Sequence, residues 1–268
     1  MANNNSKPVQ PVTKPFLKGS PFDERTVKAA LGFFGLLALS ILMGFLISSM
    51  MNFDIVWLRA LLNVTVEAMI LLIFFNQAAG RGADAVARGE ILYQRQEKGL
   101  EVSASEKAVC FHPLKGFLTG FLGTLPLLVC TILLALTTSV QHTGAGALPS
   151  WLSVYQRREE IGDPLVAYTI TSGMGLTDVV RMITRVSIMP FVSMVGSENR
   201  MGMLLLERLS PLVSLLPALA YGCGYLSGVK TRTRVHTEIA TNDRKRKRKE
   251  KKERKMRRTG PKGPEQLN

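Results

Sequence analysis

The sequence predicts an all-α integral membrane protein with four transmembrane helices, a broken re-entrant or interfacial helical segment, and a disordered polybasic C-terminal tail. The spans are predicted from four apolar stretches, each close to the roughly 20 residues that cross a bilayer core about 30 Å thick. The tail is predicted from the charge distribution. Residues 230–268 hold sixteen basic and five acidic residues, a net charge of +11, whereas the other 229 residues have a net charge of +3.

The basic residues of the tail lie mostly in one run, and such a run cannot cross a membrane. Basic residues retained beside a span set its orientation, so we expect the tail to be cytoplasmic. Four crossings are an even number, which places the N terminus in the cytoplasm too, and the predicted location is the plasma membrane. The run comprises Arg244, Lys245, Arg246, Lys247, Arg248, Lys249, Lys251, Lys252, Arg254, Lys255, Arg257 and Arg258.

Three regions are predicted along the chain: a disordered cytoplasmic N-terminal tail, a helical membrane domain and the polybasic tail. They cover residues 1–20, 21–229 and 230–268; within the membrane domain, spans are predicted at about 27–50, 53–76, 114–138 and 210–229, and a cytoplasmic helical loop at 77–113. The N-terminal tail has too few apolar residues to fold alone. In the first span, Ser40, Gly44 and Ser48 form a row of small residues that lets a neighbouring helix approach closely.

The second span carries a polar stripe, because Arg59, Asn63 and Glu67 recur every four residues on one helix face. A carboxylate near the middle of a span costs about 2.5 kcal/mol or more, so Glu67 must be protonated, paired or turned toward a wet cavity. Two interpretations stay open. Glu67 is either a proton or cation site in a transport path, or part of an interhelical polar contact, neutral or paired with Arg59, Arg181 or Arg185.

The loop after the second span holds a predicted capping box, Ser103 to Glu106. Gly80 and Gly82 form only a lone Gly-x-Gly with no strand before it, so we expect no nucleotide site there. The three cysteines show no spacing typical of a metal or redox site. We therefore expect no metal and no cofactor.

The segment 164–196 is predicted to be re-entrant or interfacial on the outer side. It contains two chain breaks and a narrow charged stripe, Asp178, Arg181 and Arg185. Counting it as one crossing would place the basic tail outside, against the charge bias. Irregular backbone at membrane depth is tolerated only against protein or a watery cavity. The last span is predicted to open at Ser210–Pro211.

Two classes of function fit these features. In the first, the chain is a non-enzymatic binding or assembly component whose tail contacts anionic lipid headgroups or ribosomal or other RNA phosphates. The tail alone resembles the polybasic cytoplasmic tails of membrane insertases, which dock ribosomes; a purely topogenic role is the simpler alternative. The second class is a small-solute or ion transporter, or a permease subunit, that uses Glu67. Expected partners are the lipid bilayer and, for the membrane domain, a second copy or another membrane protein.

Overall fold

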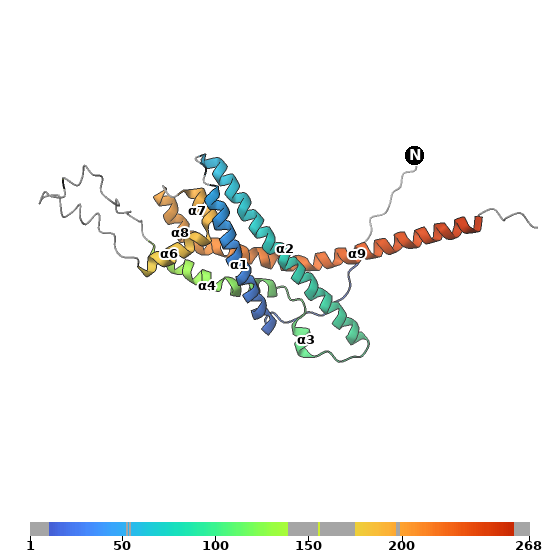
Figure 1. Cartoon of the computed structure of the whole chain (residues 1–268). Helices are drawn as coiled ribbons and strands as arrows, with labels where there is room; N and C mark the ends of the chain where they lie inside the picture. Colours follow the sequence, from blue (N-terminus) through green and yellow to red (C-terminus); the bar gives the residue numbers. More distant parts are fainter. Residues whose placement is uncertain are drawn as a thin grey trace, which may run out of the picture. The chain divides into compact units, whose positions relative to one another are not determined.

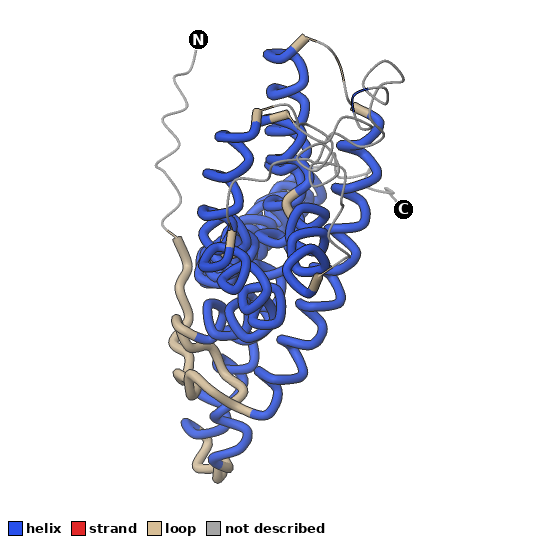
Figure 2. The backbone as a smooth tube through the Cα atoms, turned by 90° about the vertical axis from the view of Figure 1, so that its left-hand side faces the viewer, coloured by secondary structure: helices blue, strands red, loops and turns tan. Residues whose placement is uncertain are grey.

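A computed structural model of the chain describes residues 11–51, 53, 55–138, 155, 175–196 and 199–259. The elements among these residues are helices, and no strand occurs in the described part (Figure 2). In chain order they are α1 (Glu24–Met50), α2 (Val56–Glu97), α3 (Ala104–Ala108), α4 (Lys115–Thr137), α6 (Leu176–Ser187), α7 (Met189–Val195), α8 (Arg200–Ser214) and α9 (Leu216–Thr259), as labelled in Figure 1.

Four helical stretches are long and apolar enough to cross a membrane: Glu24–Met50, Val56–Glu97, Lys115–Thr137 and Met201–Arg254. The fourth stretch runs across the junction between α8 and α9. In α1, large apolar side chains such as Leu31, Leu39 and Leu42 stay exposed, although other side chains of the same helix are buried. A helix that is apolar all round is typical of a membrane span. The four helices support the predicted multi-pass membrane protein.

The described chain divides into two compact units. We call residues 24–75 and 117–222 the membrane unit, and residues 1–23, 76–116 and 223–268 the tail unit. Helices α2 and α9 each contribute residues to both units.

The membrane unit is packed around Phe33 of α1, which is fully buried. Its ring lies 5.0 Å from that of Phe74 in α2 and 5.1 Å, edge to face, from that of Tyr221 in α9. A side chain at Gly123 of α4 would collide with Phe33, so the glycine allows α4 to approach closely. A second core, formed by Ile188, Met203 and Leu206, joins the α6–α7 region to α8.

Two helix breaks in the membrane unit precede prolines. Helix α6 gives way to α7 at Ile188, before Pro190, and α8 gives way to α9 at Leu215, before Pro217. Proline lacks an N–H for the helix ladder but is tolerated in the first turn of a new helix, where Pro190 and Pro217 lie. The segment 164–196 was predicted to be broken, but the sequence analysis placed no break at Ile188, and residues 164–174, where breaks were expected, lie outside the described part.

Pro211 does not open a helix, and this part of the prediction is wrong. It lies inside α8, where its missing N–H would have served the carbonyl oxygen of Glu207. The hydroxyl of Ser210 donates to that oxygen at 2.7 Å instead. Because the side chain replaces the lost backbone bond, the helix continues through the proline.

The tail unit contains the described part of the N-terminal segment, which was predicted to be disordered. Residues 11–20 lie along the unit, where the Leu17 N–H donates to the Gly89 carbonyl at 3.2 Å and the Gly19 N–H to the Phe111 carbonyl at 2.9 Å. Phe111 also stacks on Tyr225 of α9 at 5.2 Å. Composition indicated that this segment could not fold alone, but these bonds satisfy its backbone from a neighbouring surface.

The polybasic segment is helical as far as it is described, and the predicted disorder of residues 230–259 is wrong. Helix α9 runs without a break to Thr259. Lysine, arginine and glutamate are good helix formers, and pairs such as Arg234–Glu238 at 3.0 Å and Arg246–Glu250 at 3.6 Å join successive turns. The capping box predicted at Ser103–Glu106 is confirmed at the start of α3.

Candidate functional site

The six polar residues predicted within the membrane domain do not form one site. Asp178, Arg181 and Arg185 lie together on α6, and the structure adds Glu207 of α8 as their shared partner. Arg59, Asn63 and Glu67 lie on α2, where Asn63 donates to the Arg59 carbonyl. The structure thus separates a charged cluster from a second polar region around Glu67.

Glu207 is the centre of the charged cluster. Its side chain is 3% exposed, and that of Arg181 is 9% exposed. Arg185 approaches one carboxylate oxygen through two nitrogens, with Nε at 2.9 Å and Nη2 at 2.6 Å. Arg181 Nε lies 3.3 Å from the other oxygen, and its Nη1 donates to Asp178 at 3.3 Å. The two positive arginines and the two negative carboxylates therefore balance in charge, and buried charges need such partners.

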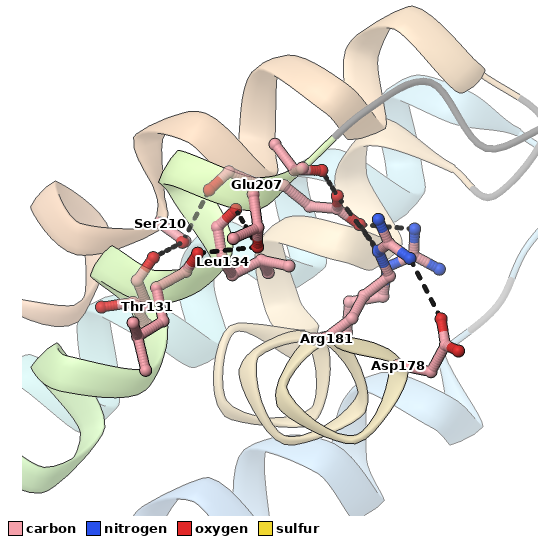
Figure 3. A network of polar contacts seen from close by, with 10 residues as sticks. Thr131, Leu134, Asp178, Arg181, Glu207 and Ser210 are labelled. Atoms are coloured by element: carbon pink, nitrogen blue, oxygen red, sulfur yellow. Dashed lines mark hydrogen bonds and ion pairs between the residues drawn. The ribbon is translucent and has the colours of Figure 1, made fainter. Parts of the chain in front are cut away.

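Hydroxyl groups of α4 and α8 extend the cluster into a polar seam (Figure 3). The Thr138 hydroxyl donates to Glu207, and Ser210 contacts the carbonyl of Thr131 at 3.5 Å. Thr131 also lies 3.5 Å from the Ser214 hydroxyl. With both oxygens of Glu207 bonded and the guanidiniums engaged, the arrangement joins α4, α6 and α8. It is suited to holding helices together rather than to acid–base chemistry.

Sequence reasoning found the α6 stripe but missed Glu207. The stripe holds Asp178, Arg181 and Arg185, which leaves one positive charge unmatched. Glu207 is a carboxylate beside an otherwise apolar stretch. The unmatched positive charge of the α6 stripe was the signal in the sequence that could have identified Glu207 as its partner. The suggestion that Arg181 or Arg185 neutralises Glu67 is wrong, because both guanidiniums bind Glu207.

Arg59 and Asn63 form a local pair in the second span. The fully buried Asn63 donates its side-chain N–H to the Arg59 carbonyl at 2.8 Å. The Arg59 guanidinium lies against Gly196, in the space that a side chain there would need. Gly196 has a φ of +80°, a conformation that favours glycine. Arg59 is thus positioned by the end of α7.

Glu67 lines a small, partly open cavity of the membrane unit. The cavity has a volume of about 30 Å³, and its walls come from α1, α2, α4 and the two helix junctions at Ile188 and Leu215. No hydrogen bond or ion pair joins Glu67 to another residue within the described chain. A carboxylate in an apolar helix needs either a partner or water, and the cavity is the space that Glu67 borders.

The tail unit has a buried ionic group of its own, which the sequence analysis did not identify. Glu90 of α2 receives Arg232 Nε at 3.1 Å on one oxygen, and its other oxygen lies 2.8 Å from His236 Nε2. Both Glu90 and His236 are less than one-tenth exposed. The Val12 N–H donates to the hydroxyl of Thr237, the residue after His236, at 3.1 Å. These contacts hold α9 against α2 and the N-terminal segment.

The predicted phosphate-binding run continues beyond these contacts on α9. All its described side chains, from Arg244 to Arg254, are exposed. One ion pair, between Arg246 and Glu250, falls within this described part of the run. The side chains of Lys255, Arg257 and Arg258 lie outside the described residues. The helix therefore presents positive charge around its whole circumference, with few acidic groups to neutralise it.

Cysteine and metal chemistry have no evident site in the described part of the chain. No group of three or more His, Cys, Asp or Glu residues there is arranged to hold a metal ion. Cys110 is fully buried, and burial raises the pKa of its thiol. The thiol stays protonated at neutral pH and donates to the Glu106 carbonyl at 3.7 Å.

No protein-family model, curated protein or solved structure matches this chain.

Proposed function

We propose that the chain is a non-enzymatic binding or assembly component of the plasma membrane, whose basic helix binds phosphate-rich RNA, such as ribosomal RNA, in the cytoplasm. The observation that carries the proposal is the continuity of α9. One helix runs from the apolar stretch that ends near Val229 into the exposed basic run at Arg244 (Figure 1). Neutralising phosphates with such a run releases counterions and drives binding without reading sequence.

The length of α9 supports RNA over the lipid headgroups of the same membrane. Arg244 follows Val229 by fifteen residues, which is about 22 Å along a helix axis at 1.5 Å per residue. Surface charges are screened beyond a Debye length of about 8–10 Å at cellular ionic strength. The start of the run is therefore separated from the end of the apolar stretch by about two Debye lengths of helix.

The contacts at the base of the helix support a fixed presentation of this charge. The Glu90 carboxylate holds Arg232 and His236, and Val12 reaches Thr237. Beyond these residues, side chains from Arg244 to Arg254 are exposed. Because the helix is already formed, binding does not require ordering a disordered segment, which lowers its entropic cost.

The chemistry of the run supports phosphate contact rather than base recognition. It contains no aromatic residue, and proteins usually bind unpaired bases by stacking them on aromatic side chains. Binding is then set by charge and spacing. It should tolerate changes in the order of residues within the run.

We expect binding to RNA to fall steeply with salt. With six to ten phosphate contacts, affinity should drop by about 10³-fold or more between about 50 and 200 mM salt. The full-length protein in neutral nanodiscs can be titrated with purified ribosomes and with single-stranded RNA. Replacing Lys247, Lys251 and Arg254 with Gln should reduce the steepness of the salt dependence.

A variant with residues 244–258 shuffled is the matched control, because it keeps charge and helix propensity and should bind like the wild type. Anionic vesicles added to the same assay test the lipid alternative. Tight binding to vesicles with no binding to ribosomes would refute the RNA proposal. Binding that is lost on shuffling would also contradict it.

The proposed topology places both termini in the cytoplasm. The bonds from Val12 to Thr237 and from Leu17 to Gly89 support it, because they bring the N-terminal segment and α9 into one unit. Single cysteines introduced by Asn5→Cys, Ser150→Cys and Lys245→Cys in a cysteine-free background test it in intact cells. An impermeant maleimide should label position 150 alone, and external labelling at position 245 would contradict the proposed topology.

Transport of a small solute or ion is the second candidate function. The observation that favours it is the cavity beside Glu67, because it lies at two helix breaks. Broken helices near the middle of a bundle are where many transporters bind their substrates. Flux into proteoliposomes that disappears with Glu67→Gln would favour this candidate over a binding role.

A further inference from the structure

The cavity beside Glu67 has the size of a single small ligand. Its volume is about 30 Å³, and about 10–15 Å³ is enough to hold one water-sized species. The polar side chains on its wall are Glu67 and three serines: Ser40 of α1, Ser187 of α6 and Ser214 of α8. The rest of the wall is apolar or glycine, so these four side chains decide what the cavity accepts.

The hydroxyls of the three serines on the wall can act as acceptors, because each donates its own proton to a backbone carbonyl. Ser40 donates to the Leu37 carbonyl at 2.8 Å, and Ser187 donates to the Ile183 carbonyl at 2.7 Å. Ser214 donates to the carbonyl of Pro211 at 2.9 Å. A hydroxyl that donates in this way keeps its lone pairs free to accept. The side chains of the wall therefore offer acceptors without a matching donor.

Helix ends add negative character to the same place. Helix α6 ends beside Ser187, and α8 ends beside Ser214. The C-terminal end of a helix carries a partial negative charge. The helices that follow begin here too, but Pro190 and Pro217 each remove one N–H from those helix starts. The partial charges that the helix ends place beside the cavity therefore favour a cation there.

The charge of Glu67 selects among cations. Within the described residues the carboxylate has no ion-pair partner, since Arg181 and Arg185 belong to Glu207. One monovalent cation on one carboxylate leaves the cavity neutral. A divalent ion would leave it positive, and Ca²⁺ takes six to eight oxygen ligands, often from several carboxylates.

We propose that this cavity is a binding site for one Na⁺ ion, held by the Glu67 carboxylate with the hydroxyl oxygens of Ser40, Ser187 and Ser214. Transporters also hold Na⁺ at a break in a span, where backbone carbonyl oxygens and helix C-terminal ends coordinate it. The site concerns binding in the membrane unit alone. It holds whether or not the ion is carried across the membrane, and it does not depend on the basic helix.

Na⁺ should stabilise the folded protein, because a ligand that binds only the native state raises its melting temperature. Full-length protein in neutral detergent is melted at constant ionic strength and pH, with Na⁺ exchanged for K⁺ or N-methylglucamine. We expect a saturable rise in melting temperature with Na⁺. Equilibrium binding of radioactive Na⁺ should give one ion per chain.

Three variants make the test specific. Glu67→Gln should abolish the Na⁺ response, and Ser40→Ala should weaken Na⁺ binding by about tenfold, the effect of losing one polar contact. Ser49→Ala is the matched control, because Ser49 also donates to a carbonyl of α1, that of Leu46 at 2.9 Å, but does not line the cavity. It should bind Na⁺ like the wild type.

If Glu67→Gln fails to fold, the Ser40 and Ser49 variants still test whether the cavity binds Na⁺. The proposal is overturned if Na⁺ acts no differently from N-methylglucamine, or if the Na⁺ response survives in a folded Glu67→Gln protein. Equal Na⁺ affinity in the two serine variants would overturn it too. A response to pH without any response to Na⁺ would make Glu67 a proton site instead.

Discussion

Replacing Glu207 with alanine is expected to destabilise the membrane unit by about 3–5 kcal/mol, the usual cost of removing one partner from a buried ion pair. The change removes the carboxylate that Arg181 and Arg185 share and leaves Arg181 buried with only the half-exposed Asp178. It also removes the acceptor of the Thr138 hydroxyl. The measurement is the free energy or temperature of unfolding in detergent.

Arg208 provides the matched control, because it is the next residue of α8 and its side chain is exposed. Arg208→Ala should change stability by less than about 0.5 kcal/mol, as exposed substitutions usually do. A double variant, Glu207→Leu with Arg181→Met, should recover part of the loss, since well-packed apolar groups can replace a buried pair. Similar unfolding energies for Glu207→Ala and Arg208→Ala would show that the cluster does not hold the helices.

Gly82→Ala is expected to separate α2 from α9 in the tail unit, at a cost of about 1–3 kcal/mol or more for an overpacked contact. A Cβ at Gly82 would overlap the backbone carbonyl of Tyr225, and one at Gly228 would lie 2.6 Å from the Gly82 Cα. Backbone atoms cannot move aside as a flexible side chain can. Limited proteolysis of the tail unit and thermal melting should both report the loss.

Gly80 is the control for this prediction, because it lies in the same helix and nothing would meet a Cβ there within 4 Å. Gly80→Ala should stabilise the protein by up to about 1 kcal/mol, since alanine favours the helix more than glycine does. Opposite signs for the two substitutions are therefore expected. Equal effects would mean that helix propensity, and not close packing, governs this region.

The sequence predicted the helical class and the four spans because these depend on local properties. A stretch such as residues 24–50 is apolar over the length of a bilayer, whichever neighbours it meets. The capping box at Ser103–Glu106 is equally local, since its two hydrogen bonds join residues three apart. The grouping of Asp178, Arg181 and Arg185 on one face also follows from helical spacing.

Errors arose where a neighbouring segment supplied what the local pattern lacked. Residues 11–20 have too few apolar side chains to fold alone, yet Gly89 and Phe111 accept their backbone N–H groups. Ser210 supplies the donor that Pro211 lacks, so α8 does not end there. In the basic run, propensity favoured a helix, and the prediction gave too much weight to its net charge.

The sequence by itself determined which segments are helical and apolar, and which polar residues share a helix face. Only the tertiary structure decided the partners of those residues: Glu207, and not Glu67, binds Arg181 and Arg185. It also decided that Glu67 faces a cavity with three serines from other helices. The physical reason is that helical periodicity depends on residues three or four apart. Ion pairs and cavities depend instead on which faces of distant helices meet, and close backbone approach at residues such as Gly123 sets that choice.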